Sequence, residues 1–151
     1  SVPSIEGVEQ TGARRAPEPP ELRDDGYWML TLGIAYAYPP AAKLLSWQRS
    51  LILTPGEGAV RLIDAFDFEQ AQRRATVRFV TPFEPVLSEG LATLGPVGMR
   101  FPREMRPSVS PIELAEPRLR ALWGDRLYRL ELATPESAPG GRLDFTFFPA
   151  T

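Results

Sequence analysis

The chain has 151 residues, of which 43% are hydrophobic and 24% are charged, and its formal net charge is -2. This size and composition fit one globular domain over residues 1–151 and exclude a disordered or fibrous protein. The sequence contains no Cys and no His, which excludes disulfides, thiolate nucleophiles, imidazole bases and ordinary zinc or copper sites. Its slight acidity offers no basic field to nucleic acid, and no apolar run reaches the roughly 20 residues that span a bilayer. We therefore expect no nucleic-acid partner, no membrane partner and no cofactor.

Proline and glycine occur throughout the sequence, with 17 Pro and 12 Gly. Because proline lacks an amide donor and fixes its backbone φ angle, so many prolines favour short segments separated by turns over long helices. This composition indicates a β-rich fold.

The N-terminal region is predicted to hold two strands around a loop. Residues 1–10 can form one strand, and residues 11–25 are polar, charged and proline-rich, as in a surface loop. Residues 27–38 place apolar side chains at every second position, which predicts a strand covered on at least one face. The chain starts at Ser1 without an initiator Met, and we interpret this start as a cut end of a longer protein.

A β-hairpin is predicted in the next segment. Residues 44–54 have one mostly apolar face and one mostly polar face, and residues 59–68 resume the alternation. The sequence Pro55-Gly56-Glu57-Gly58 between them is typical of a turn, so the two stretches are expected to pair as antiparallel neighbours.

The rest of the chain is predicted to form further short strands and one helical turn. The strands lie at residues 76–81, 86–94, 97–101, 108–114, 126–133 and 143–148. The short helix covers residues 117–123, with Pro117 at its first position and Gly124 as its C-terminal cap. About nine short strands and at most one short helix predict an all-β fold, an antiparallel β-sandwich.

Three carboxylates at the end of a predicted strand, Asp64, Asp67 and Glu69, could coordinate calcium through their oxygen atoms. Their spacing lacks the Gly and the bidentate acid of a calcium loop. We expect a solvated acidic strand end instead, and we assign no metal ligand.

The three tryptophans, Trp28, Trp47 and Trp123, could form a sugar-stacking platform with Tyr36 and Tyr38. Aromatic residues at alternating strand positions are more often part of a core, because each can bury a large area. We expect Trp28 and Trp123 in the core. Trp47 fits either role about equally, and it is kept as a candidate substrate-binding residue.

Two arginine pairs, Arg14-Arg15 and Arg73-Arg74, could hold carboxylates or sulfates of an acidic glycan by bidentate hydrogen bonds. Exposed basic pairs in loops more often serve only as solubilising charge. We keep Arg73 and Arg74 as candidate substrate-binding residues beside Trp47. No catalytic residue is assigned, because no neighbouring motif singles out a tyrosine for proton transfer.

Residues 2–12, with the sequence VPSIEGVEQTG, resemble a stretch of heparinase II/III-like proteins. Further landmarks of that family follow in the expected order: Ala35-Tyr36-Ala37-Tyr38-Pro39, Trp47-x-Arg49, Leu62-Ile63-Asp64-x-Phe66 and Leu122-Trp123-Gly124-x-x-Leu127-Tyr128-Arg129. The resemblance extends over nearly the whole chain.

The resemblance implies a two-part parent enzyme, in which a helical toroid precedes an antiparallel β-sandwich and uronic-acid polysaccharides are cleaved by β-elimination. This chain resembles only the later part of the sandwich. In the family the catalytic Tyr, its His or Asn partner and the metal-binding His residues come mostly from the toroid and the first sandwich strands. None of these residues can be carried onto a position of this sequence, so we expect a C-terminal domain that is not catalytic alone.

The resemblance also implies an acidic polysaccharide as partner, bound through the parent protein. Missing earlier strands would leave unpaired edges and uncovered apolar faces, so self-association is expected. One alternative is a self-standing carbohydrate-binding or structural module. Another is a catalytic fragment that uses only Tyr, Arg and carboxylates.

Overall fold

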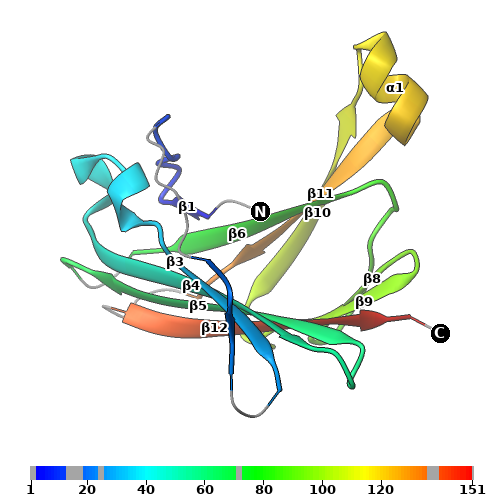
Figure 1. Ribbon diagram of the computed structural model, residues 1–151. Helices are drawn as coiled ribbons and strands as arrows, with labels where there is room; N and C mark the ends of the chain where they lie inside the picture. Colours follow the sequence, from blue (N-terminus) through cyan, green and yellow to red (C-terminus); the bar gives the residue numbers. More distant parts are fainter. Residues whose placement is uncertain (1–2, 13–18, 24–25, 71–72, 136–139, 151) are drawn as a thin grey trace.

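The computed structural model describes residues 3–12, 19–23, 26–70, 73–135 and 140–150 (Figure 1). Within these residues, twelve strands form two antiparallel sheets, accompanied by one α-helix and two 3-10 helices. The predicted all-β sandwich with one short helix is confirmed. The strands outnumber the expected nine because several of them are only two to four residues long.

The larger sheet has eight strands. In their spatial order they are β2 (Glu21–Leu22), β3 (Trp28–Gly33), β4 (Leu44–Thr54), β5 (Ala59–Phe68), β12 (Gly140–Pro149), β9 (Val97–Arg100), β8 (Leu91–Leu94) and β7 (Val86–Ser88). The centre of this sheet is formed by β4, β5 and β12, which are also its longest strands.

The smaller sheet has four strands. Their order is β1 (Ser4–Ile5), β6 (Ala75–Thr81), β11 (Arg126–Ala133) and β10 (Arg106–Glu113). Figure 1 shows β10 and β11 running away from the larger sheet and carrying α1 (Pro117–Trp123) at their far end. The positive φ of 83° at Gly124 ends this helix, as its role as C-terminal cap predicts.

The predicted hairpin is confirmed, since β4 and β5 have the expected bounds and pair from Thr54↔Ala59 onward. Three predicted strands are shortened by more than one residue or divided in the structure. Within the described residues 3–10, only Ser4–Ile5 is a strand, because the chain turns at Gly7, whose φ is +80°. The strand expected over residues 27–38 ends at Gly33, where the chain enters η1 (Ala35–Ala37).

The third difference concerns residues 86–94, which were predicted as one strand. They form β7 and β8, joined by a tight turn that contains Gly90 at φ +69°. A single apolar alternation therefore concealed a turn, because Gly90 can reverse the chain without interrupting the pattern on either side.

The core lies between the two sheets and contains side chains from both. Its buried members include Trp47, Phe66 and Phe145 from the larger sheet and Val77 and Leu130 from the smaller one. We call the face of the larger sheet that carries these residues the inner face. The opposite face is called the outer face.

The prediction that Trp28 and Trp123 belong to the core is wrong. Trp28 is 42% exposed, because it opens β3 next to the edge of the larger sheet. Trp123 is 51% exposed, because it ends the helix that projects from the β10–β11 hairpin. In the part of the chain that the structure describes, no helix combines the length and apolar character needed to cross a membrane.

Candidate functional site

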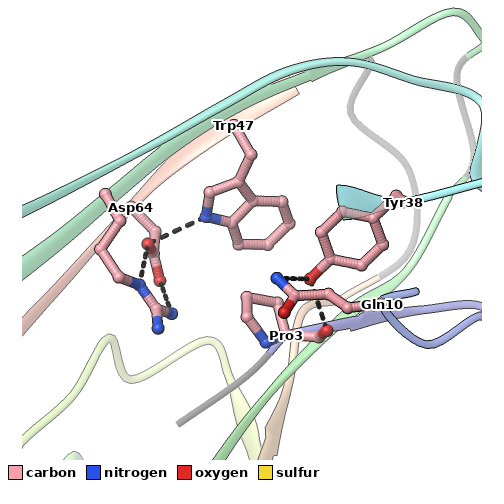
Figure 2. Close-up of polar contacts among 6 residues, drawn as sticks. Pro3, Gln10, Tyr38, Trp47 and Asp64 are labelled. Atoms are coloured by element: carbon pink, nitrogen blue, oxygen red, sulfur yellow. Dashed lines mark hydrogen bonds and ion pairs between the residues drawn. The ribbon is translucent and has the colours of Figure 1, made fainter. Parts of the chain in front are cut away.

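A buried polar network lies on the inner face of β4 and β5. Arg49 and Asp64 are directly opposite each other in the register of these strands, and the Arg49 guanidinium donates two hydrogen bonds to the carboxylate, at 2.8 and 2.7 Å. The indole Nε1 of Trp47 donates to the same carboxylate at 2.9 Å (Figure 2). Such a pair is stable inside a protein only when its hydrogen bonds are made, and here the carboxylate receives three.

This network corrects the expectation of a solvated acidic strand end. Asp64 is 0% exposed, whereas Asp67 and Glu69 are exposed. Asp64 and Asp67 lie three residues apart on one strand, so their side chains point to opposite faces of the sheet. No three potential acidic ligands come close enough to hold a metal ion among the residues whose placement is described.

A second set of contacts lies beside this network and connects the N-terminal segment to the larger sheet. The Tyr38 hydroxyl donates to the Pro3 carbonyl at 2.6 Å and accepts a hydrogen bond from Gln10 Nε2 at 3.3 Å. Figure 2 shows Trp47 between Asp64 on one side and Tyr38 on the other. Burial raises the pKa of Tyr38 to about 12, while the hydrogen bond from Gln10 acts in the opposite direction. Tyr38 is thus a buried donor and is not suited to act as a base near neutral pH.

The same N-terminal segment holds η1 in place. Both the backbone amide and the hydroxyl of Thr11 donate to the Ala37 carbonyl, at 2.7 and 3.0 Å. The η1 segment is thereby fixed at Ala37, and the next residue, Tyr38, is anchored by its hydroxyl. Tyr36 lies inside this fixed turn and is 45% exposed.

A hollow of about 510 Å³ opens next to Tyr36, on the outer face of the larger sheet. Its lining residues are Gly33, Ala35, Tyr36, Leu45, Ser46, Trp47, Gln48, Ala65 and Asp67. We call it the outer-face hollow. On β4 the side chains of Ser46 and Gln48 alternate with that of Trp47, so one strand contributes to both the buried network and the hollow.

The floor of the hollow is a row of register partners, Gly33↔Gln48↔Ala65, on three adjacent strands. Small residues flank Gln48 on both sides, and a Cβ added at Gly33 would meet no atom within 4 Å. Beside this row, Ser46 Oγ donates to Asp67 Oδ2 at 3.2 Å. The lining therefore combines an aromatic ring with amide, hydroxyl and carboxylate groups, which suits a ligand rich in hydroxyl groups.

The structure separates the substrate-binding residues that were predicted from the sequence. Trp47 is 1% exposed in the larger sheet, whereas Arg73 and Arg74 directly precede β6 of the smaller sheet. Arg73 is partly buried and Arg74 is exposed, and the Arg74 amide donates to Glu6 Oε1 at 2.6 Å. A substrate-binding role for these three residues stays a prediction. Arg14 and Arg15 lie outside the described residues.

Sequence reasoning did not identify Gln48 or the hollow, and it considered Asp67 only as part of an acidic strand end. Tyr36 was considered as part of a stacking platform with the three tryptophans. Trp28 and Trp123 do not line this hollow, and Trp47 lines it but is buried. The polar positions Ser46 and Gln48 on one face of β4 were a usable signal. Their meaning depended on Gly33 lying opposite Gln48, which is a property of the β3–β4 register.

No protein-family model matches the sequence, and no curated protein matches it. Among the solved structures that share its fold are a heparinase III and a heparan sulfate lyase. A heparinase III has a TM-score of 0.71 at 10% sequence identity, covering 99% of this chain and 23% of the other. A mutant of the heparan sulfate lyase HepC from Pedobacter heparinus has a TM-score of 0.57 at 12% identity, covering 99% of this chain and 24% of the other.

The chain thus spans about a quarter of the length of each solved structure that it resembles. At these identities the likeness concerns the fold. The resemblance that the sequence landmarks predicted is confirmed at that level: the chain has the fold of a region found in heparinase III and in a heparan sulfate lyase.

Proposed function

We propose that this chain is a non-catalytic C-terminal β-sandwich domain, over residues 1–151, of a heparinase II/III-like polysaccharide lyase. Its parent protein cleaves uronic-acid polysaccharides by β-elimination. The observation that carries this proposal is the match of 99% of the chain to about a quarter of a heparinase III and of a heparan sulfate lyase. One domain of a larger enzyme is expected to match over nearly its whole length while covering only a small part of the enzyme, as these coverages do.

The chemistry of the chain supports a non-catalytic role. β-Elimination needs a base for the C5 proton of the uronate, and with no His in the sequence the available bases are tyrosines, carboxylates and the single lysine, Lys43, which pairs with Glu69. Tyr38 is buried, its hydroxyl is engaged by Pro3, and burial raises its pKa to about 12. Asp64 is held by Arg49 and Trp47. The base in this proposal comes from elsewhere in the parent protein.

Apolar surfaces at two places support contact with further parts of the parent. On α1, Leu122 is 76% exposed and Trp123 lies beside it. At the other place, an apolar groove of about 480 Å³ is lined by residues that include Trp28, Leu51 and Leu53. Large exposed apolar patches are rare on isolated proteins and often mark contact sites.

The proposal is tested by deleting this region from the parent protein. Ultraviolet absorbance of the unsaturated uronate product is measured with heparan sulfate, alginate and hyaluronan, for the intact parent and for the deletion variant. We expect release by the intact parent and a loss of most of it on deletion, with circular dichroism verifying that the remaining part is folded. Full activity of the folded deletion variant would contradict the proposal.

The second candidate is a self-standing carbohydrate-binding module, and the outer-face hollow is the observation that favours it. A glycan array probed with this chain alone separates the two candidates. Strong autonomous binding, together with full lyase activity of the parent lacking this region, would favour the module.

A further inference from the structure

We propose that the outer-face hollow binds an uncharged pyranose unit of a glycan. This inference goes beyond the proposed function, because it assigns a site and a ligand class on this chain that β-elimination of uronates does not require. It can hold or fail independently of the lyase proposal.

The aromatic side of the hollow is held in place before any ligand arrives. Tyr36 is one of the lining residues, and the segment around it is anchored by the bonds from Thr11 to Ala37 and from Tyr38 to Pro3. A ring that is already positioned loses little conformational freedom on binding. The axial C–H groups of a pyranose form an apolar face that packs on such a ring, so Tyr36 supplies the stacking surface.

The floor provides the space for a sugar ring. Gly33 and Ala65 flank Gln48 in one register row, and the position above Gly33 is open. The volume of about 510 Å³ lies within the ~300–1,000 Å³ typical of small-ligand sites. The Gln48 amide has donor and acceptor atoms, so it can satisfy two neighbouring hydroxyl groups of a pyranose.

Charge determines which kind of sugar fits. Asp67 is the one acidic residue among the lining residues, none of which is basic, and its carboxylate accepts hydrogen bonds from hydroxyl groups but repels a uronate or a sulfate. Ser46 holds one oxygen of Asp67 at 3.2 Å. Gly140 lets this side chain lie close to β12, because a Cβ there would come within 2.2 Å of Asp67 Oδ1. Arg142, the next residue along the floor row on β12, is not among the lining residues.

Calorimetric titration of the whole chain tests the site with cellohexaose and chitohexaose as uncharged probes and hexamannuronate as the acidic probe. We expect at least one uncharged probe to bind with a dissociation constant of about 1 mM or tighter. Hexamannuronate is expected to bind at least about tenfold more weakly. Failure of both uncharged probes to bind at about 10 mM, or tighter binding of hexamannuronate, would overturn the inference.

The Gly33→Val variant examines whether binding occurs in the hollow. Its side chain would project into the open space above the floor, and valine is favoured in strands, so the fold is expected to be retained. We expect binding of the uncharged probe to become undetectable while the thermal midpoint does not fall. A folded Gly33→Val chain that binds the probe as the unchanged protein does would refute the assignment.

Two further variants examine stacking and charge, each with a matched control. Tyr36→Ala is expected to weaken binding about tenfold, whereas Trp123→Ala, which removes an exposed ring on α1, leaves it unchanged. Asp67→Asn is expected to weaken binding about threefold or more, whereas Glu57→Gln in the exposed β4–β5 turn has no effect. Tighter binding of an uncharged probe to Asp67→Asn would show that the carboxylate accepts no hydrogen bond from the sugar and would contradict the inference.

Discussion

Asp64 is the acceptor of the buried polar network in the larger sheet. It is fully buried, and it accepts hydrogen bonds from both Arg49 and Trp47. Replacing it by Asn leaves the buried guanidinium without this negative charge, so Asp64→Asn is expected to lower the free energy of unfolding by about 3–5 kcal/mol. Urea unfolding monitored by tryptophan fluorescence measures the change.

The control is a second Arg–Asp pair on the outer face of the same sheet. Arg61 and Asp144 pair there with both side chains more than a third exposed, so Asp144→Asn is expected to cost less than about 1 kcal/mol. Equal losses for the two variants would show that burial of the Arg49–Asp64 pair has no effect on its contribution.

Tyr38 is expected to make stability depend on pH at the alkaline end. Its ordinary pKa is 10.0 and burial raises the folded-state pKa to about 12, so the unfolded chain releases this proton first as the pH rises. The contribution of Tyr38 is therefore complete below pH 10.0 and is lost as the pH rises toward about 12. Unfolding free energies of the unchanged protein and of Tyr38→Phe are expected to converge across this window. If the unfolding free energies of the two proteins instead changed with pH in parallel, the assignment to Tyr38 would be contradicted.

At the level of single residues, sequence patterns predicted the face of the sheet on which a side chain lies but not how far that side chain is buried. Alternation correctly put Trp28 on the inner face, yet Trp28 is exposed because alternation does not report how far the facing sheet extends. Trp47 has the same pattern and is buried, since it lies toward the other end of β4 from Leu53, which is the register partner of Trp28 and is itself 44% exposed. Asp64 was predicted to be solvated because its side chain is charged, although its strand position faces the core. The prediction overlooked Arg49, whose positive charge makes the burial of Asp64 possible.

At the level of elements, β9 and β12 show how a glycine can be required inside a strand. Gly98 faces Phe148 in their register, and a Cβ added at Gly98 would lie 2.5 Å from the ring. The Phe148 ring also lies under Arg100, whose Cζ is 4.5 Å from the ring centroid. Gly98→Ala is therefore expected to destabilise the protein by about 1–3 kcal/mol, as overpacking does.

Gly33→Ala is the matched control for Gly98→Ala, because Gly33 is also a glycine in a strand. Its added Cβ meets nothing within 4 Å, so this variant is expected to be neutral or to stabilise by up to about 1 kcal/mol. Thermal unfolding of both variants measures the difference. A Gly98→Ala protein as stable as Gly33→Ala would show that Phe148 moves aside without cost.

Part of the candidate site could be predicted from the elements. The turn at residues 55–58 places Thr54 opposite Ala59, and the same register puts Arg49 opposite Asp64 and Gln48 opposite Ala65. The buried Arg49–Asp64 pair could therefore have been predicted from the sequence once the hairpin was recognised. The position of Gly33 opposite Gln48 could not be predicted in this way, because β3 and β4 are joined through η1 and η2 (Pro40–Ala42) and not through a short turn.

At the level of the whole molecule, the apolar groove at Trp28 and Leu53 predicts self-association of the isolated chain. The double variant Trp28→Ser/Leu53→Ser is expected to reduce the apparent mass at high concentration in light scattering. Val86→Ser, which removes a 68% exposed apolar side chain elsewhere, is expected to leave the mass unchanged. A strictly monomeric unchanged protein would count against this prediction and in favour of a self-standing module.

The fold class followed from the sequence as a whole, because proline and glycine spacing and two-residue alternation both indicate short antiparallel strands. The assignment of strands to two sheets of eight and four could not be derived in the same way. It depends on which strands pair over long distances in the chain, such as β12 with β5 and β6 with β11, and local patterns do not specify those partners.

One assay decides whether this chain lacks its own base for β-elimination. The isolated chain and the same chain joined to the upstream part of its parent are incubated with heparan sulfate, alginate or hyaluronan, and the absorbance of unsaturated uronate is followed. We expect no release by the isolated chain and release by the joined protein. Release by the isolated chain that survives repurification and is abolished by replacing one tyrosine with phenylalanine would contradict this expectation.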